Sequence, residues 1–357
     1  MHLILPVGGQ SSRFPNLRPK WMLTHPNGNL MIAECIRDWD LSNVDQILIV
    51  CLRQHEEQYA ATHMLHKQFS KFGLNDRLKV IVIDQSDSQP HTVYQSLLAA
   101  DVHGPILVKD SDNFFAHKPS PGNSICFSTI SELRHGRVDQ KSYVMMNKAN
   151  QVLNIVEKRV ISDTFCVGGY GFENADDFIA TYEKIKDAPD LYISHVIYQM
   201  LLDGTVFNGA KVSHYLDWGT LEDWNEYRQR FCSLFIDLDG VLVENSAEYF
   251  HPTWGTTDAI PENVDAINQL YDSGYSEIIL VTSRTQESEQ ITLEQLARAG
   301  VKYHRIMFGL MHAKRIMVND YANSNPYRSC DAINILRDSN QLRQMLQGLI
   351  AMPENHL

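Results

Sequence analysis

The sequence predicts a two-domain α/β protein. Short apolar runs alternate with segments of helical periodicity along most of its 357 residues, a pattern typical of βαβ units around a mostly parallel sheet. The length agrees, because a single hydrophobic core rarely grows beyond about 250–300 residues. A second series of apolar runs starts near residue 232 and soon reaches a new pair of acids, in the sequence FIDLDG. We therefore expect domains at residues 1–229 and 231–357.

The expected elements of the first domain follow in order. HLILPV, QILIVC, KVIVID and PILVKD predict strands, because each is a short apolar run. NLMIAECIRDW and TVYQSLLAAD carry apolar residues at helical spacing. SICFSTI and GGYGFENADDFIATY continue with a strand pair and a helix, and HYLDWGTLEDWNEYRQRF closes the domain with a loop and a polar helix.

The second domain repeats this alternation. SLFIDLDG, SEIILVTSR and KRIMVND predict strands, and PENVDAINQLYDSG and ESEQITLEQLARAG predict helices between them.

Composition narrows the class of function. The net charge of −12 argues against a general nucleic-acid binder. The six cysteines are scattered and form no CxxC pair, as expected of reduced core residues in a cytoplasmic protein. The apolar N-terminal run is too short for a signal peptide, and no stretch approaches the roughly 20 apolar residues of a membrane span. We expect a soluble cytoplasmic protein without nucleic-acid or membrane partners; the oligomeric state is not assigned.

The first strand leads into a candidate phosphate loop, LPVGGQSSRFPNLRPKWML. Gly8 and Gly9 would let backbone N–H groups approach phosphate oxygens. Ser11 and Ser12 add hydroxyl donors, and Arg13 and Lys20 add positive charge. A plain strand-to-helix turn with surface cations fits the same residues.

The spacing G-G-x-x-x-R followed by P-K resembles the signature of nucleotidyltransferases that make sugar nucleotides and CDP-alcohols, and the resemblance covers residues 1–229. It implies a Rossmann-like mixed-sheet domain. LVKDSDNFF resembles the family's metal-binding strand end, with Asp112 and its neighbour Asp110 as magnesium ligands. LDWGTLEDW resembles the closing motif, in which Asp217 is the second ligand.

The same resemblance implies the residues that hold the substrates. IVEKR places Glu157 and Lys158 on the side of the accepting phosphate, and GGYGF places Gly169 near the acceptor. Gln85 and Thr92 fall where the nucleotide is bound. The usual G-T-A segment of the base site is PHTVYQS here, so the base is not assigned, although CTP or UTP is favoured. Two simpler interpretations stay open: Asp110 could cap a turn, and Glu157 could pair with Lys158.

The second domain opens with Asp237-x-Asp239-Gly-Val at the end of a strand. Residues i and i+2 of a strand point the same way, so both acids can face one phosphate. A carboxylate nucleophile needs no deprotonation at pH 7. The motif resembles motif one of the haloacid dehalogenase-like (HAD) phosphatases. The resemblance implies that Asp237 attacks phosphorus, that Asp239 acts as acid and base, and that both contribute to a magnesium site.

The other HAD motifs follow in order over residues 232–340. Thr282, Ser283 and Arg284 end the next apolar strand and resemble the phosphate-binding motif two. Lys314 matches the motif-three cation, with Lys302 or Arg315 as alternatives, and Asp320 matches the motif-four magnesium ligand. The short gaps between these motifs cannot hold a folded cap, so we expect a smaller Rossmann-like HAD domain without a cap domain. The aromatic stretch around Trp254 could select the substrate or pack at a domain interface.

Together these features predict a bifunctional enzyme. One domain would activate a phosphorylated sugar, polyol or amino-alcohol with an NTP and release pyrophosphate. The other would hydrolyse a phosphomonoester of the same pathway through an aspartyl phosphate, with Mg²⁺ in both sites. Such a fusion fits the synthesis of bacterial capsule or lipopolysaccharide precursors. Two alternatives stay open. In one, a single domain, with the transferase favoured, is catalytically silent and serves as a nucleotide-binding or scaffolding module beside the other; in the second, the second domain passes its phosphate to an alcohol.

Overall fold

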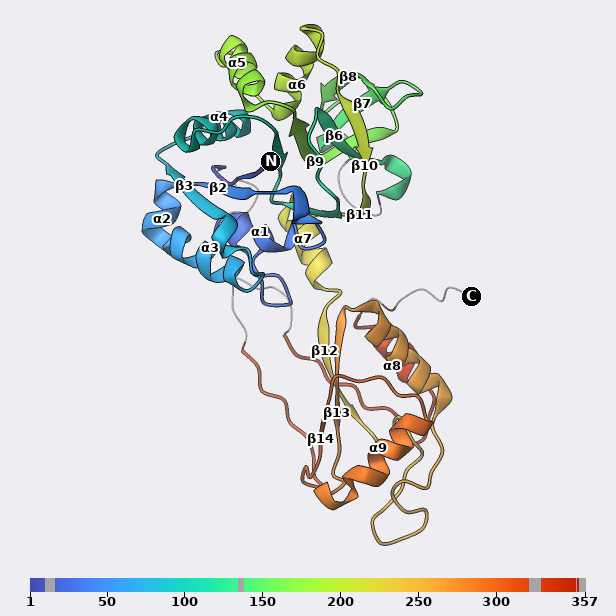
Figure 1. Cartoon of the computed structure of the whole chain (residues 1–357). Coiled ribbons are helices and arrows are strands. Elements are labelled where there is room, and N and C mark those ends of the chain that lie inside the picture. Colours follow the sequence, from blue (N-terminus) through green and yellow to red (C-terminus); the bar gives the residue numbers. More distant parts are fainter. Residues whose placement is uncertain (10–16, 134–137, 321–328, 351, 353–357) are drawn as a thin grey trace. The chain divides into compact units, whose positions relative to one another are not determined.

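The computed structural model describes most of the chain, in five stretches: residues 1–9, 17–133, 138–320, 329–350 and 352. The chain divides into two compact units, Met1–Asn225 and Glu226–Leu357. Each unit has its own sheet and its own hydrophobic core (Figure 1).

Four parallel strands form one half of the first unit's sheet: β1 (His2–Pro6), β2 (Gln46–Leu52), β3 (Leu78–Ile83) and β4 (Ile106–Lys109). They lie in the order β3-β2-β1-β4 and all pair in parallel. These are the four strands predicted from their apolar runs.

Helices cover both faces of these strands (Figure 1). They are α1 (Met31–Glu34), α2 (Arg53–Tyr59), α3 (Ala61–Ser70) and α4 (Gln89–Ala100). Leu48 and Val50 of β2 share a core cluster with Val93 and Leu97 of α4. The alternate residues of β2 point to the opposite face of the sheet. Burial on both faces explains why the strands are continuous apolar runs rather than alternating ones.

Helix α1 is much shorter than the helix expected from NLMIAECIRDW. It ends at Glu34, and the chain continues in turns to Trp39. There the indole Nε1 donates a hydrogen bond of 2.9 Å to the carbonyl oxygen of Phe115. This hydrogen bond joins two residues that are 76 positions apart in the sequence, so the local spacing of apolar residues could not reveal it.

The other half of the sheet is largely antiparallel. β9 (Thr164–Phe172) runs antiparallel to β4 and to β6 (Ser124–Thr129), and β10 (Asn208–Lys211) pairs in parallel with β6. The hairpin of β7 (Ser142–Met146) and β8 (Val152–Glu157) joins β9 through β7. Within the described residues the sheet is nine-stranded and mixed, which confirms the expected mixed α/β architecture of this domain.

A two-stranded ribbon and three helices complete the first unit. β5 (Asn113–Ala116) pairs antiparallel with β11 (Ser213–Asp217). HYLD, which we expected in a loop, is therefore strand, because its backbone finds a partner roughly 100 residues earlier in the chain. The helices are α5 (Ala175–Ile185), α6 (Ile193–Leu202) and α7 (Leu221–Arg228), the last of which contains the boundary between the units at Asn225.

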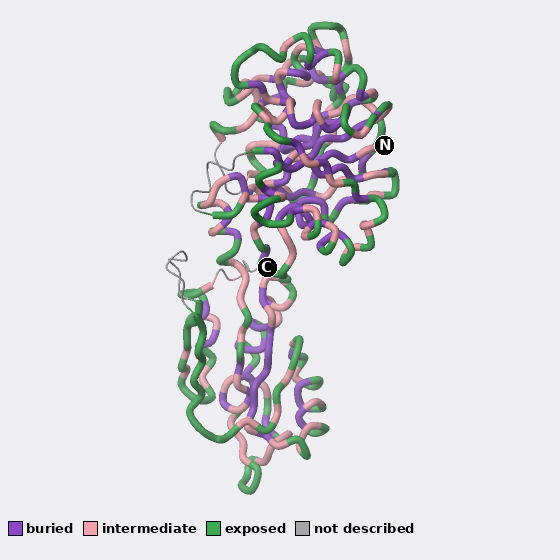
Figure 2. The backbone as a smooth tube through the Cα atoms, turned by 90° about the vertical axis from the view of Figure 1, so that its left-hand side faces the viewer, coloured by how far each residue is buried: buried purple, intermediate pink, exposed green. Residues whose placement is uncertain are grey.

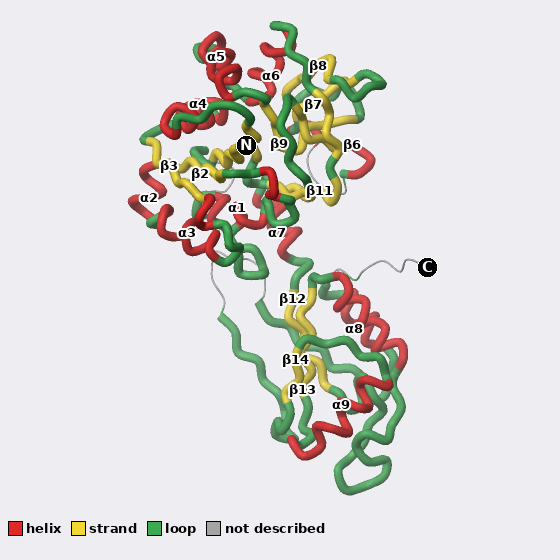
Figure 3. The backbone as a smooth tube through the Cα atoms, in the orientation of Figure 1, coloured by secondary structure: helices red, strands yellow, loops and turns green. Residues whose placement is uncertain are grey.

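The second unit contains a three-stranded parallel sheet in the described residues, ordered β12-β13-β14. Its strands are β12 (Cys232–Asp237), β13 (Ser276–Val281) and β14 (Arg305–Met307), and its helices are α8 (Pro261–Ser273), α9 (Glu289–Arg298) and α10 (Leu342–Gln347). Much of the remainder is loop (Figure 3).

The strand expected at KRIMVND was wrong. Residues 314–320 belong to no helix or strand, and Ile316 and Val318 are 75% and 91% exposed. The short strand β14 takes the free edge of β13 instead. An apolar run predicts a strand only if a neighbouring edge accepts it.

Burial is concentrated in the two sheets (Figure 2). Among the helices of the described residues, none is long and apolar enough to cross a membrane.

Candidate functional site

The strand order predicts a ligand-binding crevice at the carboxyl ends of β1 and β4. The connections leaving β1 and entering β4 run to opposite sides, so the sheet has its topological switch point between these two strands, where open α/β sheets bind ligands. Ile4 of β1 pairs with Val108 of β4. This register brings the glycine loop after β1 beside the acids that follow β4.

Gly8 is a glycine for a steric reason. A Cβ on Gly8 would lie 2.8 Å from Oγ1 of Thr92, a residue of α4. Thr92 is itself buried and hydrogen-bonded to Ser86 (2.7 Å) and to the carbonyl oxygen of Ser88 (3.2 Å). The structure therefore gives Thr92 a supporting place beneath the loop, whereas Gly9 and Gln85 are exposed. Ser11, Ser12 and Arg13 lie outside the described residues.

Lys20 and Asp112 form an ion pair in this crevice. Lys20 starts a short 3-10 turn, Lys20–Met22, whose Trp21 is buried and anchors it. Both charged side chains keep about a fifth of their surface exposed. A cation and a carboxylate that sequence analysis assigned to triphosphate and metal are thus adjacent.

Asp217 reaches the same region on β11. It pairs with Asn113 in the β5–β11 ribbon, and Trp218 N donates a 2.9 Å hydrogen bond to the carbonyl oxygen of Asp112. The antiparallel ladder therefore brings the backbones of Asp112 and Asp217 together from more than 100 residues apart.

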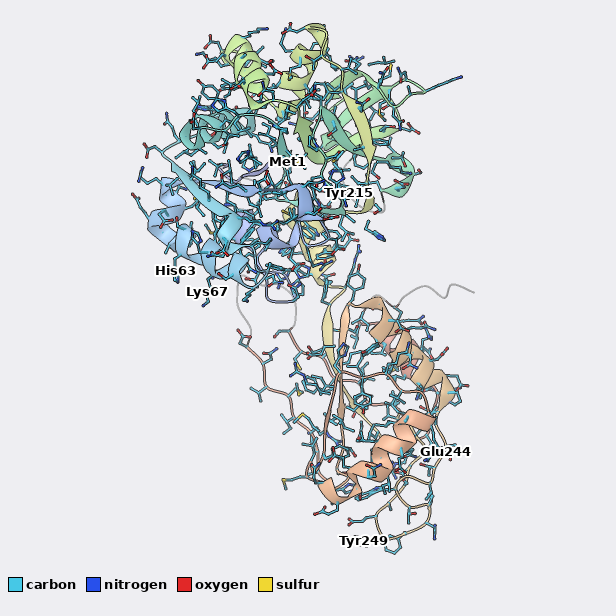
Figure 4. The ribbon with its side chains drawn as sticks, in the orientation of Figure 1. Met1, His63, Lys67, Tyr215, Glu244 and Tyr249 are labelled. Carbon is cyan, nitrogen blue, oxygen red and sulfur yellow. The ribbon has the colours of Figure 1, made fainter. Side chains whose placement is uncertain are left out.

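Lys141 also contacts Asp217 and was missed by sequence analysis. Its Nζ forms an ion pair with Asp217 and donates a 2.8 Å hydrogen bond to the hydroxyl of Tyr215, which Figure 4 labels beside β11. Burial lowers the pKa of Lys141, but Tyr215 and Asp217 outweigh it and hold that pKa above its usual value. Lys141 lies 76 residues from Asp217 in sequence, in no motif.

Asp110 is half-buried and is held by two neighbours. Its carboxylate accepts a hydrogen bond from Gln89, at the start of α4, and its backbone N–H donates to Gly168. Burial, then repulsion from Asp112, raises the pKa of Asp110 to about 6. The carboxylate thus contacts a helix terminus and β9, and Gln89 is a second residue that sequence analysis did not find.

Gly168, rather than Gly169, faces these acids. Its φ is +79°, and a Cβ there would lie 2.7 Å from Cγ of Asp110. A Cβ on Gly169 would instead meet Cys126 and Phe115 in the core. Neighbouring residues of a strand face opposite sides, so identifying the glycine required knowledge of the register.

Glu157 and Lys158 have separate partners. Glu157 accepts hydrogen bonds from Ser142 and Ser194, and Lys158 donates to the hydroxyl of Tyr192. No ion pair joins Glu157 to Lys158 among the described residues, so the simple pairing considered from sequence is not what the structure shows. Lys158 has φ of +52°, a conformation uncommon outside glycine that clusters at functional sites.

The donor set in the crevice suits magnesium. Within the described residues no cluster of three or more His, Cys, Asp or Glu side chains forms a metal site. Two carboxylates, Asp112 and Asp217, are nevertheless sufficient when phosphate oxygens complete the shell, as is usual for Mg²⁺ with nucleotides.

The second unit also ends a strand in charged residues. Asp237 is the last residue of β12, and Arg315 Nη1 lies 3.1 Å from its Oδ2. Burial raises the pKa of Asp237, whereas Arg315 lowers it. Of the three cations weighed from sequence, Arg315 is the one at Asp237. Lys302 pairs with Asp272, and Lys314 is exposed.

Asp239 is fixed by a buried arginine. Arg284 is 0% exposed, and its Nε and Nη2 donate to the two carboxylate oxygens of Asp239 at 2.9 and 2.8 Å. Its Nη1 donates to Thr292 and Gln295 of α9. Arg284 was expected to bind substrate phosphate; its guanidinium is instead used within the protein.

The remaining expected residues divide into two groups. Thr282 is fully buried beyond the end of β13, and Ser283 beside it is partly exposed. No hydrogen bond or ion pair of the described residues joins Asp320 to Asp237, because the exposed segment 314–320 is not paired with the sheet. In the loop after Asp239, Tyr249 and Phe250 are 80% and 74% exposed, and Tyr249 lies at the loop's tip (Figure 4).

Gly168→Ala should destabilise the first unit by more than about 1 kcal/mol, because its left-handed backbone and the contact with Asp110 both oppose a side chain. Urea unfolding would measure the change. Gly204→Ala is the matched control: Gly204 has φ of +91° but nothing within 4 Å. Equal losses for the two variants would show that the contact with Asp110 contributes nothing.

Arg284→Met should destabilise the second unit by about 3–5 kcal/mol, because it leaves Asp239 without its buried partner. Lys302→Met removes an exposed ion pair with Asp272 and should have a much smaller effect. Chemical denaturation followed by circular dichroism distinguishes them. Similar effects from both variants would contradict a stabilising role of the Arg284–Asp239 pair.

Comparisons with known proteins support the fold of the first unit. No family model matches the sequence, and no curated protein is similar to it. A nucleoside-diphosphate-sugar pyrophosphorylase from Vibrio cholerae RC9 matches with a TM-score of 0.54 at 18% identity, over 63% of this chain and 98% of that one. The apo UDP-glucose pyrophosphorylase structure matches with a TM-score of 0.50 at 13% identity, over 63% and 95%. At these identities the likeness establishes the fold alone: the first unit has a mixed α/β fold like that of these two pyrophosphorylase structures.

Proposed function

We propose that the chain is a bifunctional enzyme, with a nucleotidyltransferase in the first unit and a phosphatase in the second. The observation that carries the transferase is the pair of carboxylates, Asp112 and Asp217, each beside a lysine at the switch point of the sheet. This arrangement suits two anionic substrates and a divalent cation.

The proposed substrates are based on the charged residues of the site and on the enzymes that the similar structures are named for. Proteins of this fold include a nucleoside-diphosphate-sugar pyrophosphorylase and a UDP-glucose pyrophosphorylase. An NTP and a phosphorylated sugar, polyol or amino-alcohol are therefore the proposed substrates, with CTP or UTP favoured. A cytoplasmic role in making capsule or lipopolysaccharide precursors is part of the same proposal.

In the transferase reaction an oxygen of the phosphate ester attacks the α-phosphorus of the NTP, and pyrophosphate leaves. Catalysis then depends on positioning and charge neutralisation. Arg13 and Lys20 would bind the triphosphate, and Lys158 the phosphate of the acceptor. Asp112 and Asp217 would hold Mg²⁺, which when bound neutralises charge on the phosphates. Asp110, held by Gln89 and Gly168, would support this constellation from below.

In the phosphatase reaction Asp237 attacks phosphorus and the alcohol leaves, after which water hydrolyses the aspartyl phosphate. Arg315, which faces Asp237, can bind the transferred phosphoryl group. Asp239 would protonate the leaving oxygen, so its contact with Arg284 must loosen during the cycle. Mg²⁺ would bind at Asp237, Asp239 and Asp320, which requires Asp320 to reach the end of β12, where Arg315 of the same segment already lies.

Asp112→Asn should reduce nucleotidyl transfer at least about a hundredfold, since it removes a charge that stabilises the transition state, while phosphatase activity is retained. Asp237→Asn should remove the nucleophile and abolish phosphate release, while transfer is retained. Pyrophosphate and phosphate release from the full chain measure the two. Loss of both activities in either folded variant would exclude two independent sites.

The phosphatase should need ionised Asp237, so kcat/KM should fall as the pH drops through its pKa. Arg315→Met removes the cation that lowers this pKa, so the acidic limb should move to higher pH. Lys302→Met, whose lysine pairs with Asp272, should leave the limb in place. An unmoved limb in Arg315→Met would contradict the role of Arg315.

A further inference from the structure

Lys141 stands between the two halves of the transferase site. It directly precedes β7, and its carbonyl oxygen accepts a 3.0 Å hydrogen bond from the backbone N–H of Lys158. Ser142, the next residue, pairs across the hairpin with Glu157. Lys141 is thus attached to the segment proposed to face the accepting phosphate, while its side chain reaches Asp217.

The ammonium group of Lys141 is well enclosed. The side chains of Lys141 and Asp217 are only 14% and 9% exposed. The hydroxyl of Tyr215 accepts a 2.8 Å hydrogen bond from Nζ of Lys141, and the centre of the Tyr215 ring lies 5.4 Å from Nζ. Tyr215 itself packs edge-on against Phe165 of β9. The ammonium group of Lys141 is therefore held by Tyr215, whose ring is itself packed against the sheet.

The charges of Lys141 and Asp217 must both stay compensated when a ligand binds. Buried charges need partners, and removing one partner leaves the other uncompensated. A divalent cation at Asp217 would take the carboxylate from Lys141 and would repel the ammonium at short range. A phosphate dianion arriving beside the cation would supply the missing negative charge to Lys141.

We propose that Lys141 is a phosphate-binding residue that also balances the charge of Asp217. Its ammonium neutralises Asp217 in the ligand-free protein and binds the phosphate of the accepting ester when a divalent cation occupies Asp217. The inference rests on the nucleotidyl transfer proposed above. It predicts that cation and phosphate bind together better than either binds alone.

The first test is Mn²⁺ affinity of the full chain, measured from the electron paramagnetic resonance signal of free Mn²⁺. Every protein, the wild-type reference included, carries Asp237→Asn, which removes a ligand of the second unit's proposed metal site. Lys141→Met should bind Mn²⁺ more tightly by about tenfold, because the cation no longer displaces an ammonium. Asp217→Asn should weaken binding. Lys148→Met removes the same charge from an exposed position near the opposite end of β7 and should leave the affinity unchanged.

The second test uses inorganic phosphate as the probe for the phosphomonoester. In the wild-type protein, phosphate should tighten Mn²⁺ binding. In Lys141→Met that effect should fall about tenfold, since the cationic partner of the phosphate is absent. Lys141→Gln is a second neutral variant that keeps a donor for Asp217, so it tests the same charge should the methionine variant unfold.

The outcomes distinguish a failure of the role proposed for Lys141 from a failure of the proposed metal site at Asp217. If Asp217→Asn weakens Mn²⁺ binding but neither neutral variant of Lys141 tightens it, the role of Lys141 is overturned and the metal site stands. If phosphate tightens Mn²⁺ binding equally in wild type and both variants, Lys141 does not bind phosphate. If wild type and Asp217→Asn bind Mn²⁺ equally, the proposed metal site fails, and the role of Lys141 fails with it.

Discussion

Both candidate sites depend on one constraint: carboxylates that lie at or just beyond strand ends need cations that compensate their charge. Four ion pairs do this: Lys20–Asp112, Lys141–Asp217, Arg315–Asp237 and Arg284–Asp239. In the first unit the antiparallel ribbon of β5 and β11 brings Asp217 to Asp112, which follows β4, and in the second unit Asp237 and Asp239 both come from the end of β12. Acids this close together repel one another. Each acid therefore has a cation beside it, and the same cations can serve an anionic substrate.

The four pairs are not equivalent. Arg284 is completely buried and uses all its donor directions within the protein, so its pair with Asp239 is part of the framework. Arg315 and Asp237 are each about two-fifths exposed, which leaves their charges accessible to a phosphate. Exposed pairs contribute little to stability. Burial thus separates a cation that builds the site from one that can take part in the reaction.

Sequence reasoning was most reliable where information is local. The strands β1 to β4 are continuous apolar runs. Asp237 is the last residue of β12 and Asp112 lies shortly after β4, so both could be located from the chain alone. Lys141 and Gln89 could not, because their partners lie 76 and 21 residues away and belong to other elements. The exchange of Gly168 for Gly169 is an error of one residue, and in a strand one residue changes the face.

The failed prediction at residues 314–320 has a related origin. IMV has the composition of a strand, but pairing is decided by which sheet edge is open and how far the chain must travel to reach it. The structure leaves this segment exposed. Arg315 of this segment already pairs with Asp237. The proposed phosphatase requires Asp320, at the other end of the segment, to reach Asp237 as well, so substrate or cation binding would have to bring it there.

The measurement that tests the account most directly is Mg²⁺-dependent pyrophosphate release by the full chain, with each NTP combined with a panel of sugar, polyol and amino-alcohol phosphates. The account predicts pyrophosphate release, with CTP or UTP, for at least one ester, and its loss in Asp217→Asn. If phosphate is released but no combination of NTP and ester gives pyrophosphate, the proposed transferase is contradicted and the first unit is left as a binding module.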